Sequence, residues 1–536
     1  MAQPRKVLAF AVLGIVSLPL LAVVPSYRVG GAAPDASLAA DVVYRSTTGP
    51  NGTSAPNHRS GISSWTAPSV EPDSGSPILA VQIAQSPRST NERIFVTQGD
   101  DGWLDAYICA TPCSVTSDVG QVWGTAPGTF QRRFDVAYEQ HSGDALLVYG
   151  VLSTNGTEDL AYRTYGGGAW SAERFLDDSG HSSNLQYSLI SLASRKGSDQ
   201  IGLLAGESTN NHVNAWIWDG ASFGSHAEIT ANAQSPNRER AAIAWESSSG
   251  HLLAMAVDAG AQDEIVWREY TTGWSPPSNQ ACGGAGNTLR WLSLRPNPSP
   301  TANDMVLAAG DDGSDLGTCY WTGSSWGART PQDPSIDASA SRAFDFAWAA
   351  SGNGGILAYG TTAGQITYRT FTAPGSWGNA TEVAMGANAH AWVQLRTNPS
   401  PSADAPKVLG AILESSANAL GAVAWNNTGL AVLGAEIFTS DMGSAAYESF
   451  DLEFRVAGTS GGGLGDILKF LMDPMVLVVL GFVAVAAILL AAARSRRRRR
   501  RTSTPPPSYP APDPGSGPPP DPVVDPPPPE DETQIY

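Results

Sequence analysis

The sequence contains little lysine and few charged residues of any kind. Lysine occurs only at Lys6, Lys196, Lys407 and Lys469, charged residues make up 15% of the 536 positions, and the formal net charge is −18. Binding to nucleic acid requires a surplus of Lys and Arg facing the phosphates. The composition therefore argues against nucleic acid as the main partner.

Cysteine is also scarce, because the chain has only Cys109, Cys113, Cys282 and Cys319. A disulfide framework is therefore not what holds this long chain together. Pairing Cys109 with Cys113 and Cys282 with Cys319 suits an oxidising compartment, although four cysteines allow three connectivities. A zinc site built from all four is disfavoured, since the second pair lacks short ligand spacing.

The usual signatures of enzymes are missing too. No Walker A loop, dinucleotide-binding fingerprint or GxSxG elbow occurs in a suitable context, and the seven histidines include no HExxH pair. Glu139 and Glu246 follow two similar segments and fit either rim positions or an acid/base pair, because the sequence does not give their separation. The sequence leaves catalysis undecided, leans toward a non-catalytic protein and indicates no cofactor.

Two acidic turns are the only candidates for a metal ion, which would be calcium. The turns "GDDGWLD" and "GDDGSDLG" do not fit EF-hand spacing, and ordinary hairpin turns are the favoured interpretation. The calcium candidates in them are Asp100, Asp101, Asp105, Asp311, Asp312 and Asp315.

Two apolar segments predict where the chain is located. Residues 1–33 resemble a signal peptide, with Arg5 and Lys6 before an apolar run, and an uncleaved signal anchor is the alternative. Met475–Ala493 is an unbroken apolar run long enough to cross a bilayer as a helix. The seven arginines that follow, within 494–501, should remain on the cytoplasmic side and so place the preceding body outside the cell.

The segments that flank the predicted membrane helix are not expected to fold. Residues 456–474 are a Gly-rich linker, and 494–536 form a basic and then Pro-rich tail that is expected to be disordered and could serve as a spacer or as a docking strip for a cytoplasmic partner. Sequons compatible with exposed loops, and hence with glycosylation, occur at Asn51, Asn155, Asn379 and Asn426.

Between these segments, one short phrase recurs about every 104 residues. The segments "RRFDVAYE", "RAAIAWE", "RAFDFAWA" and "ESFDLEFR" align and place an aromatic residue at one position, namely at Tyr138, Trp245, Trp348 and Phe454. A later tryptophan closes the same units at Trp65, Trp170, Trp274 and Trp377. A second, related unit alternates with the first, so that each unit spans about half the period.

Each unit contains four short apolar runs separated by Gly, Asn, Asp and Ser turns, which is the signature of a β-propeller blade. Seven full units begin near Leu79, Phe134, Gln186, Ala241, Leu289, Phe344 and Trp392. The fragment around Tyr44 has only the late part of a unit and the one around Phe454 only the early part. We therefore predict an all-β, eight-bladed propeller over 41–455, closed by strands from both ends of the chain; seven blades and a β-solenoid are the alternatives.

The repeated units resemble those of secreted or membrane-anchored multiblade β-propeller proteins of bacteria and archaea, including sialidase-like and integrin-like ectodomains. The sialidase likeness is incomplete, since "TSDVGQVW" (116–123) is a single Asp-box-like segment and no "FRIP"-like motif occurs. Residues that recur with the repeat are expected to be structural. These are the aspartates Asp135, Asp345 and Asp451 and the arginines Arg45, Arg163, Arg268 and Arg369.

Three hypotheses follow for the function. The favoured one is a single-pass protein of the cell surface whose propeller binds a protein or glycan partner for adhesion or recognition. The alternatives are a membrane-tethered, sialidase-like hydrolase that acts on glycans and a structural component of a cell-envelope complex.

Overall fold

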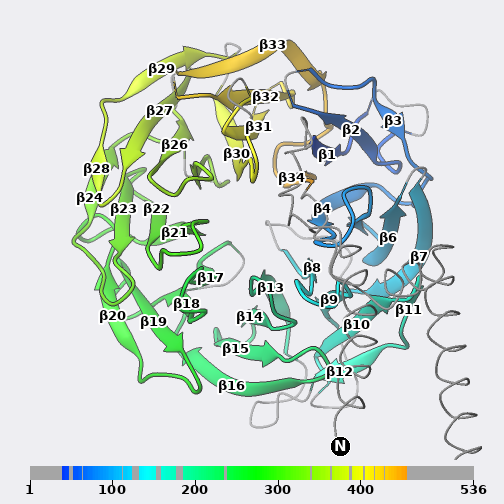
Figure 1. Ribbon diagram of the computed structural model, residues 1–536, viewed down its shortest axis with the longest axis horizontal. Coiled ribbons are helices and arrows are strands. Elements are labelled where there is room, and N and C mark those ends of the chain that lie inside the picture. Colours follow the sequence, from blue (N-terminus) through cyan, green and yellow to red (C-terminus); the bar gives the residue numbers. More distant parts are fainter. Residues whose placement is uncertain are drawn as a thin grey trace, which may run out of the picture. The chain divides into compact units, whose positions relative to one another are not determined.

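The computed structural model describes residues 39–455, apart from gaps at 48–51, 63, 111–112, 124–131, 152–157, 177–184, 235–237, 338–340, 362–364, 386–388, 402–404, 416 and 428, and only the backbone of 431–437. The described strands form eight antiparallel sheets that follow one another around a ring (Figure 1). The predicted signal peptide, linker, membrane helix and tail lie outside the described residues. Over the described part of the chain, no helix is long and apolar enough to span a bilayer.

Each sheet is a blade whose strands run from the centre of the ring outward, and we name each blade by its inner strand. The inner strands are β4 (Ile78–Gln85), β8 (Phe134–Tyr138), β13 (Tyr187–Ser194), β17 (Ala241–Trp245), β21 (Leu289–Pro296), β25 (Phe344–Trp348), β30 (His390–Thr397) and β34 (Phe450–Phe454). The second strands are β1 (Ala40–Tyr44), β5 (Arg93–Gly99), β9 (Ala145–Gly150), β14 (Ile201–Glu207), β18 (Leu252–Val257), β22 (Met305–Asp311), β26 (Gly354–Gly360) and β31 (Val408–Glu414).

The remaining strands form the outer part of each blade. The third strands are β2 (Asn57–Gly61), β6 (Trp103–Cys109), β10 (Leu160–Gly166), β15 (Val213–Trp218), β19 (Glu264–Tyr270), β23 (Leu316–Trp321), β27 (Gln365–Thr372) and β32 (Leu420–Trp425). The outer strands are β3 (Ser69–Val70), β7 (Cys113–Gln121), β11 (Ala169–Trp170), β12 (Arg174–Leu176), β16 (Phe223–Thr230), β20 (Ser278–Ala281), β24 (Thr330–Asp333), β28 (Ser376–Trp377), β29 (Thr381–Ala384) and β33 (Leu430–Thr439).

The ring is closed by a blade that both ends of the propeller share. Strand β1 pairs with β34, with Tyr44 opposite Phe450 and Ala40 opposite Phe454. This blade has the order β3-β2-β1-β34 and is the eighth sheet, so the predicted eight-bladed ring is confirmed and the seven-bladed alternative is wrong. Shared closure pairs the backbone groups of β34 and β1 that would otherwise form bare strand edges.

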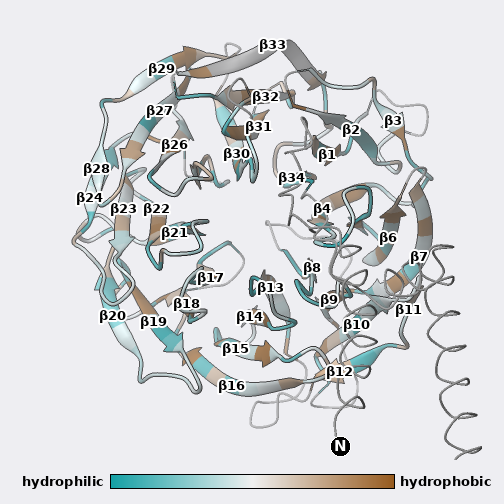
Figure 2. Cartoon of the chain, in the orientation of Figure 1, coloured by the Kyte–Doolittle hydropathy of each residue, from teal (hydrophilic) through white to brown (hydrophobic). Residues whose placement is uncertain are grey.

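The second strands are the most buried because blades cover both of their faces. In β9, Ala145, Leu147 and Tyr149 pack with residues of the β4 blade, whereas Leu146 and Val148 pack with residues of the β13 blade. Burial on both faces explains why such strands show apolar runs and no alternation with polar residues. Strand β22 accordingly is brown along most of its length in Figure 2, while the outer strand β20 is white to teal.

The repeated aromatic residues take equivalent places in alternate blades. Tyr138, Trp245, Trp348 and Phe454 each end an inner strand and are buried. The closing tryptophans Trp65, Trp170, Trp274 and Trp377 each pair with the last part of a third strand. A contact that returns at the same place in each such blade indicates a structural role.

Arginines of the third strands also repeat one contact, with one correction to the alignment. Each donates to the carbonyl oxygen of the residue after a closing tryptophan, at 3.0–3.2 Å; the pairs are Arg163 with Ser171, Arg268 with Ser275, and Arg369 with Gly378. Arg45 does not belong to this series, because it follows β1, a second strand, and donates to Ile78 instead. Its segment resembles the third-strand phrase only in sequence.

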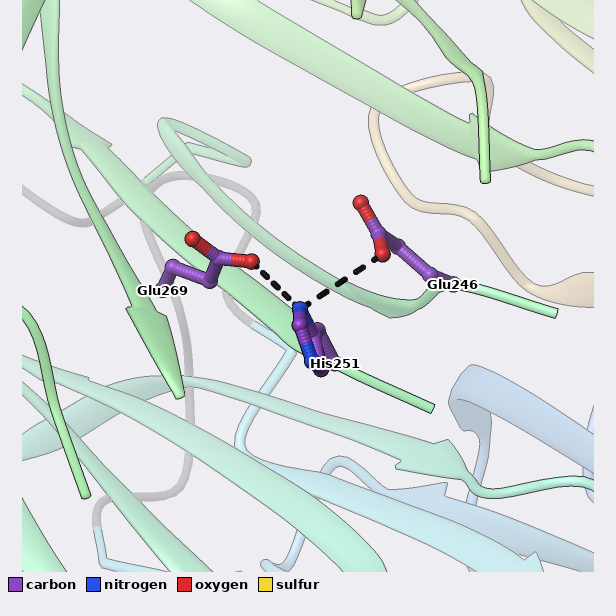
Figure 3. A group of neighbouring side chains, drawn as sticks. All are labelled: Glu246, His251 and Glu269. Atoms are coloured by element: carbon purple, nitrogen blue, oxygen red, sulfur yellow. Dashed lines mark hydrogen bonds and ion pairs between the residues drawn. The ribbon is translucent and has the colours of Figure 1, made fainter. Parts of the chain in front are cut away.

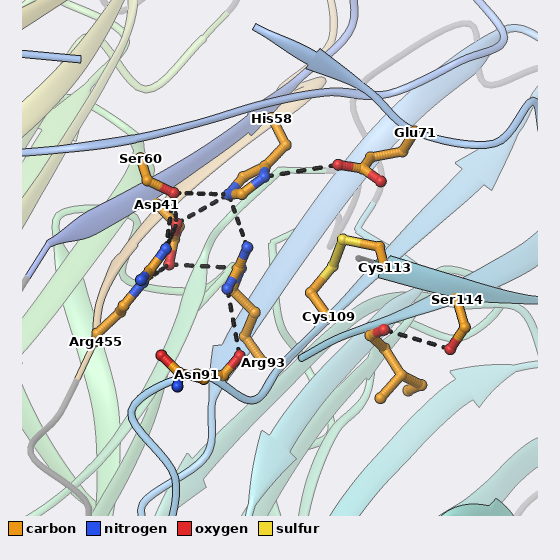
Figure 4. Close-up of a disulfide and its surroundings, with 11 residues drawn as sticks. Asp41, His58, Ser60, Glu71, Asn91, Arg93, Cys109, Cys113, Ser114 and Arg455 are labelled. Carbon is orange, nitrogen blue, oxygen red and sulfur yellow. Dashed lines mark hydrogen bonds and ion pairs between the residues drawn. A yellow bond between two sulfur atoms is a disulfide. The ribbon is translucent and has the colours of Figure 1, made fainter. Parts of the chain in front are cut away.

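The structure contains two disulfides with different positions. Cys109–Cys113 closes the hairpin between β6 and β7 (Figure 4). Cys282–Cys319 joins the segment after β20 to β23 and so links the β17 blade to the β21 blade.

Candidate functional site

The inner strands surround a polar central cavity, which is the candidate site. Its volume is about 420 Å³, and residues from all eight inner strands or the segments just before or after them line it. The neutral polar lining includes Gln82, Gln85, Gln140, Ser191, Ser194, Ser293 and Gln394. The charged lining comprises Arg132, Asp135, Glu239, Arg295, Arg342, Arg396, Glu448, Asp451 and Glu453.

Four of these charged residues form a ring of alternating sign, which we call the quartet: Arg132, Glu239, Arg342 and Glu448. They occupy equivalent positions, each two residues before an inner strand, in the β8, β17, β25 and β34 blades. Arg132 contacts Glu239 at 3.1 Å, and Arg342 contacts Glu239 at 2.5 Å and Glu448 at 3.0 Å. An electrostatic interaction between Glu448 and Arg132 closes the ring. Since these blades are not neighbours, the four side chains of the quartet meet only because they extend into the central cavity.

The two glutamates of the quartet differ in their pKa. Burial by itself raises the pKa of Glu239, but the guanidinium groups of Arg342 and Arg132 outweigh it, and the pKa is lowered. Burial and the nearby charge of Glu239 raise the pKa of Glu448 to about 7. The difference follows from geometry, because Glu239 contacts two arginines and Glu448 contacts one.

The repeated aspartates connect neighbouring blades. One oxygen of each accepts from the backbone N–H of the next residue and the other from an N–H on the inner strand of the next blade, at 2.8–2.9 Å. The acceptor and donors are Asp135 with Val136 and Leu192, Asp345 with Phe346 and Leu395, and Asp451 with Leu452 and Ile83. The prediction that these aspartates satisfy backbone donors is confirmed, and in the β17 blade Ala242 takes their position.

Asp345 is also the centre of an ion-pair cluster. Arg295 contacts it at 2.6 Å, and Arg342 and Arg396 lie at 3.7 Å. Burial alone raises the pKa of Asp345, but the charges of Arg295 and Arg342 outweigh it and lower the pKa to about 2. Among the described residues, no cation lies within ion-pair distance of the buried carboxylate Asp135, and burial raises its pKa to about 6.

The side chains that face the cavity solvent are mainly cationic. The exposed fraction of the side chain is 31% for Arg295, 19% for Arg396 and 18% for Arg132, whereas Glu239, Asp345, Glu448 and Asp451 are at most 5% exposed. Among the lining carboxylates that form these ion pairs, only Glu453 is open to solvent, and 35% of its side chain is exposed. A ligand in the cavity would therefore meet three guanidinium groups and one carboxylate, that of Glu453.

Glu139 and Glu246 do not form an acid/base pair in the cavity. Each accepts a 2.6 Å hydrogen bond from a buried indole N–H of the following blade, from Trp218 to Glu139 and from Trp321 to Glu246. Each also accepts from a serine hydroxyl in its own turn, Ser142 or Ser249. The repeated geometry shows that these glutamates anchor one blade to the next.

The calcium candidates do not converge on a common point within the described residues. In one turn, Asp100 accepts from Ser76 Oγ, Asp101 from the N–H of Trp103 and Asp105 from that of Asp118. The other turn is similar, because Asp311, Asp312 and Asp315 accept from Gly313, Thr288 and Asn287. Asp101 and Asp311 therefore close their own turns, as in ordinary hairpins, and the other four carboxylates accept from other segments.

One group of three potential ligands does come together in the described residues: Glu246, His251 and Glu269 (Figure 3). The sequence placed Glu246 among the candidates but not the other two. A signal was present, because the β8 blade has Asp144 and Thr164 where the β17 blade has His251 and Glu269. Sequence reasoning also missed the quartet. Its alternating charges become visible only when the residues two positions before the inner strands of alternate blades are compared.

A second charged cluster lies at the closure of the ring, outside the cavity (Figure 4). Asp41 of β1 contacts Arg455, directly after β34, at 2.8 Å, His58 of β2 at 2.9 Å and Arg93 of β5 at 3.5 Å. Burial raises the pKa of Asp41, but hydrogen bonds from His58 and Arg455 outweigh it and lower the pKa well below its usual range. This cluster joins the first and last strands to the β4 blade.

The remaining predicted sites lie on the surface or outside the described part. Asn379 and Asn426 are exposed, in agreement with their expected loop positions, and Asn51 and Asn155 lie outside the described residues. The Asp-box-like segment 116–123 falls mostly within β7, where Asp118 has a positive φ of 56°.

Comparisons with known proteins give no family. No protein-family model matches the chain, and no curated protein matches its sequence. Solved structures with some similarity include the BP39L lectin from Burkholderia pseudomallei, with 12% identity, a TM-score of 0.48, and coverage of 66% of this chain and 97% of that one. Another is AofleA from Arthrobotrys oligospora, with 13% identity, a TM-score of 0.34, and coverage of 57% and 87%.

A third is the Aleuria aurantia lectin, whose structure is described as a six-bladed β-propeller with a novel fucose recognition mode; it has 8% identity, a TM-score of 0.33, and coverage of 66% and 94%. The present chain has eight blades. These similarities are too low to assign a ligand to it.

Proposed function

We propose that this protein is a non-catalytic recognition module that binds a glycan in the central cavity of its propeller. The observation that carries the proposal is the layering of the cavity wall. The buried carboxylates are tied to arginines or backbone N–H groups, while three guanidinium groups and the carboxylate of Glu453 are open to solvent and amide and hydroxyl groups line the wall beside them. Such donors suit the hydroxyl and carboxylate groups of sugars.

The dimensions of the cavity support a compact ligand. Its volume of about 420 Å³ lies in the range of roughly 300–1,000 Å³ that is typical of small-ligand sites. A flat protein surface would not enter this concave site, whereas one end of an oligosaccharide would. The rigid ring of blades supplies the pre-organisation that binding of a flexible sugar requires.

A hydrolase is the second candidate, because three cavity carboxyls have the raised pKa that a general acid needs. These are Asp135, with a pKa of about 6, Glu448, with a pKa of about 7, and Glu453, whose pKa is raised by burial. However, both oxygens of Asp135 accept from backbone N–H groups, and Glu448 is bonded to Arg342 and Gln394. Glu453 is more open, but it is paired with Arg396 at 3.4 Å and accepts a hydrogen bond from the N–H of Phe454. None of the three carboxyls is available to protonate a leaving group without breaking contacts of the scaffold, so we favour binding.

The test is a glycan array probed with the full-length protein, beside a hydrolysis screen of the same glycans. We expect binding to neutral or carboxylated glycans without release of sugar. Ser191→Tyr, which would fill part of the cavity from β13, should abolish binding. The control Ser222→Tyr, on an exposed turn of the same blade, should bind normally.

Two results would overturn the proposal. Binding that survives Ser191→Tyr would place the ligand outside the cavity, and sugar release that depends on Glu448 would favour the hydrolase.

We also propose that Met475–Ala493 anchors the chain, with the propeller outside the cell and the tail in the cytoplasm. Deletion of 475–493 should then move the protein out of the membrane fraction, and protease added to intact cells should cleave the propeller but not the tail.

A further inference from the structure

The group Glu246, His251 and Glu269 has the composition and spacing of a metal site. Nδ1 of His251 lies 2.7 Å from Oε1 of Glu269 and 3.8 Å from Oε2 of Glu246, and all three potential ligand atoms lie within 4.8 Å of one another. They come from three successive segments of one blade: Glu246 follows β17, His251 precedes β18, and Glu269 is in β19 (Figure 3).

Contacts outside the group orient one of its ligands in advance. The side chain of Glu246 is fully buried, and its Oε1 accepts the 2.6 Å hydrogen bond from the indole N–H of Trp321. The other oxygen, Oε2, accepts from Ser249 Oγ in the turn and lies 3.8 Å from Nδ1 of His251. Hydrogen bonds that orient ligating carboxylates in this way are a common feature of metal sites.

The β8 blade shows that the fold does not need the other two ligands. That blade has the same turn, in which Glu139 accepts from Trp218 and Ser142, and the N–H of Asp144 donates to Ser142 Oγ just as that of His251 donates to Ser249 Oγ. Asp144 and Thr164 stand in the places of His251 and Glu269. The imidazole and the second carboxylate are therefore additions to a scaffold that forms without them.

We propose that Glu246, His251 and Glu269 bind a divalent transition-metal ion of the zinc class through Oε2, Nδ1 and Oε1. Tetrahedral zinc has nitrogen and oxygen ligands at about 2.0–2.2 Å, which places ligand atoms roughly 3.3 Å apart. The observed separations of 2.7 and 3.8 Å lie on either side of this value. The imidazole favours zinc over calcium or magnesium, which prefer sets of oxygen ligands.

Solvent reaches the site from one side. The side chain of His251 is 38% exposed and that of Glu269 is 25% exposed, while Glu246 closes the opposite side. A water molecule or a donor group of a ligand would complete the coordination on the open side. The site lies in a single blade and does not rest on the function proposed for the cavity.

The test is calorimetric titration of the chelator-treated, full-length protein with zinc chloride. We expect one site in the wild type and at least tenfold weaker binding in both His251→Asn and Glu269→Gln. Both residues are partly exposed, so the variants should fold, which circular dichroism will check. Zinc should also raise the Tm of the wild type but not of His251→Asn, since binding to the folded state stabilises it.

The matched control is Asp144→Asn, at the position in the β8 blade that corresponds to His251, and it should bind zinc as the wild type does. Wild-type affinity in either His251→Asn or Glu269→Gln would overturn the proposal. Tighter binding of calcium chloride than of zinc chloride would show that the assigned metal class is wrong.

Discussion

The β8 and β17 blades share one design but differ at four polar or charged positions. Both end their inner strand with a buried aromatic residue, Tyr138 or Trp245, followed by a glutamate that accepts from a tryptophan of the next blade. The differences in the β17 blade are Glu239 for Arg132, Ala242 for Asp135, His251 for Asp144 and Glu269 for Thr164. The shared contacts are those that the fold needs. The differences set the alternating charges of the quartet and add the His251 and Glu269 side chains of the proposed metal site.

The largest expected effect comes from giving the β8 blade the charge of the β17 blade. Arg132→Glu would remove one of the two cations that Glu239 contacts and add a third glutamate to the quartet. Breaking a buried ion pair costs about 3–5 kcal/mol, so we expect a loss of that size in the free energy of unfolding. Urea denaturation followed by tryptophan fluorescence would measure it, with Arg132→Lys as the charge-preserving control. A loss below about 1 kcal/mol would show that the quartet is not structural.

The two glutamates of the quartet should respond to pH in opposite directions. The pKa of Glu448 is about 7 in the folded state against an ordinary value of 4.5, so between these values the folded state holds more protons than the unfolded chain. The contribution of Glu448 to the free energy of unfolding is therefore fully present below pH 4.5 and is lost as the pH rises to 7, by up to about 3 kcal/mol.

Denaturation of the wild type and Glu448→Gln across this range would test the pH dependence, because the variant should gain stability relative to the wild type as the pH rises. For Glu239 the folded pKa is lowered, so its contribution is lost as the pH falls below 4.5. Glu239→Gln should accordingly show the reverse trend in acid. The same pH response in both variants would contradict the assignment.

A smaller effect is expected when the β8 blade receives the alanine of the β17 blade. Asp135→Ala would leave the buried N–H of Val136 and the half-buried N–H of Leu192 without their side-chain acceptor. Each such loss costs about 1–3 kcal/mol, and we expect a total near 2 kcal/mol, because the carboxylate is itself costly to bury. The shift in the midpoint of urea denaturation would measure this loss. Asp135→Asn, which keeps a side-chain acceptor, is the control. An unchanged midpoint would mean that the connection between blades is dispensable.

The smallest effect concerns the β25 blade, which departs from the design that the β8 and β17 blades share. Ala349 stands where they have Glu139 and Glu246, and the indole N–H of Trp425 has no partner among the described residues. Ala349→Glu should supply the missing acceptor and raise the free energy of unfolding by about 1 kcal/mol. Thermal denaturation would detect this as a higher Tm. Ala349→Gln should raise the free energy of unfolding by less. A loss of stability in both variants would show that the β25 blade cannot accept the glutamate that the β8 and β17 blades carry at this position.

Periodicity made most of the fold predictable. The predicted starts at Phe134, Ala241, Leu289 and Phe344 coincide with the first residues of inner strands, and the closure of the ring follows from two incomplete units. The error at Arg45 arose because "VVYRS" resembles a third-strand phrase although it belongs to a second strand. Local resemblance cannot reveal which neighbour a strand will pair with.

The candidate sites were less predictable than the fold. Arg132 and Glu239 are 107 positions apart, and nothing near either in the chain indicates that they meet across a channel. His251 and Glu269 likewise come together only because β18 and β19 pair.

The sequence by itself determined the class of fold, the number of blades and the residues that recur with them, because each blade must bury the same kind of face against its neighbours. Only the tertiary structure decided which charges face one another in the channel and which side chains could share a metal ion. Such contacts join side chains from separate strands and blades, and their geometry exists only once the ring has closed.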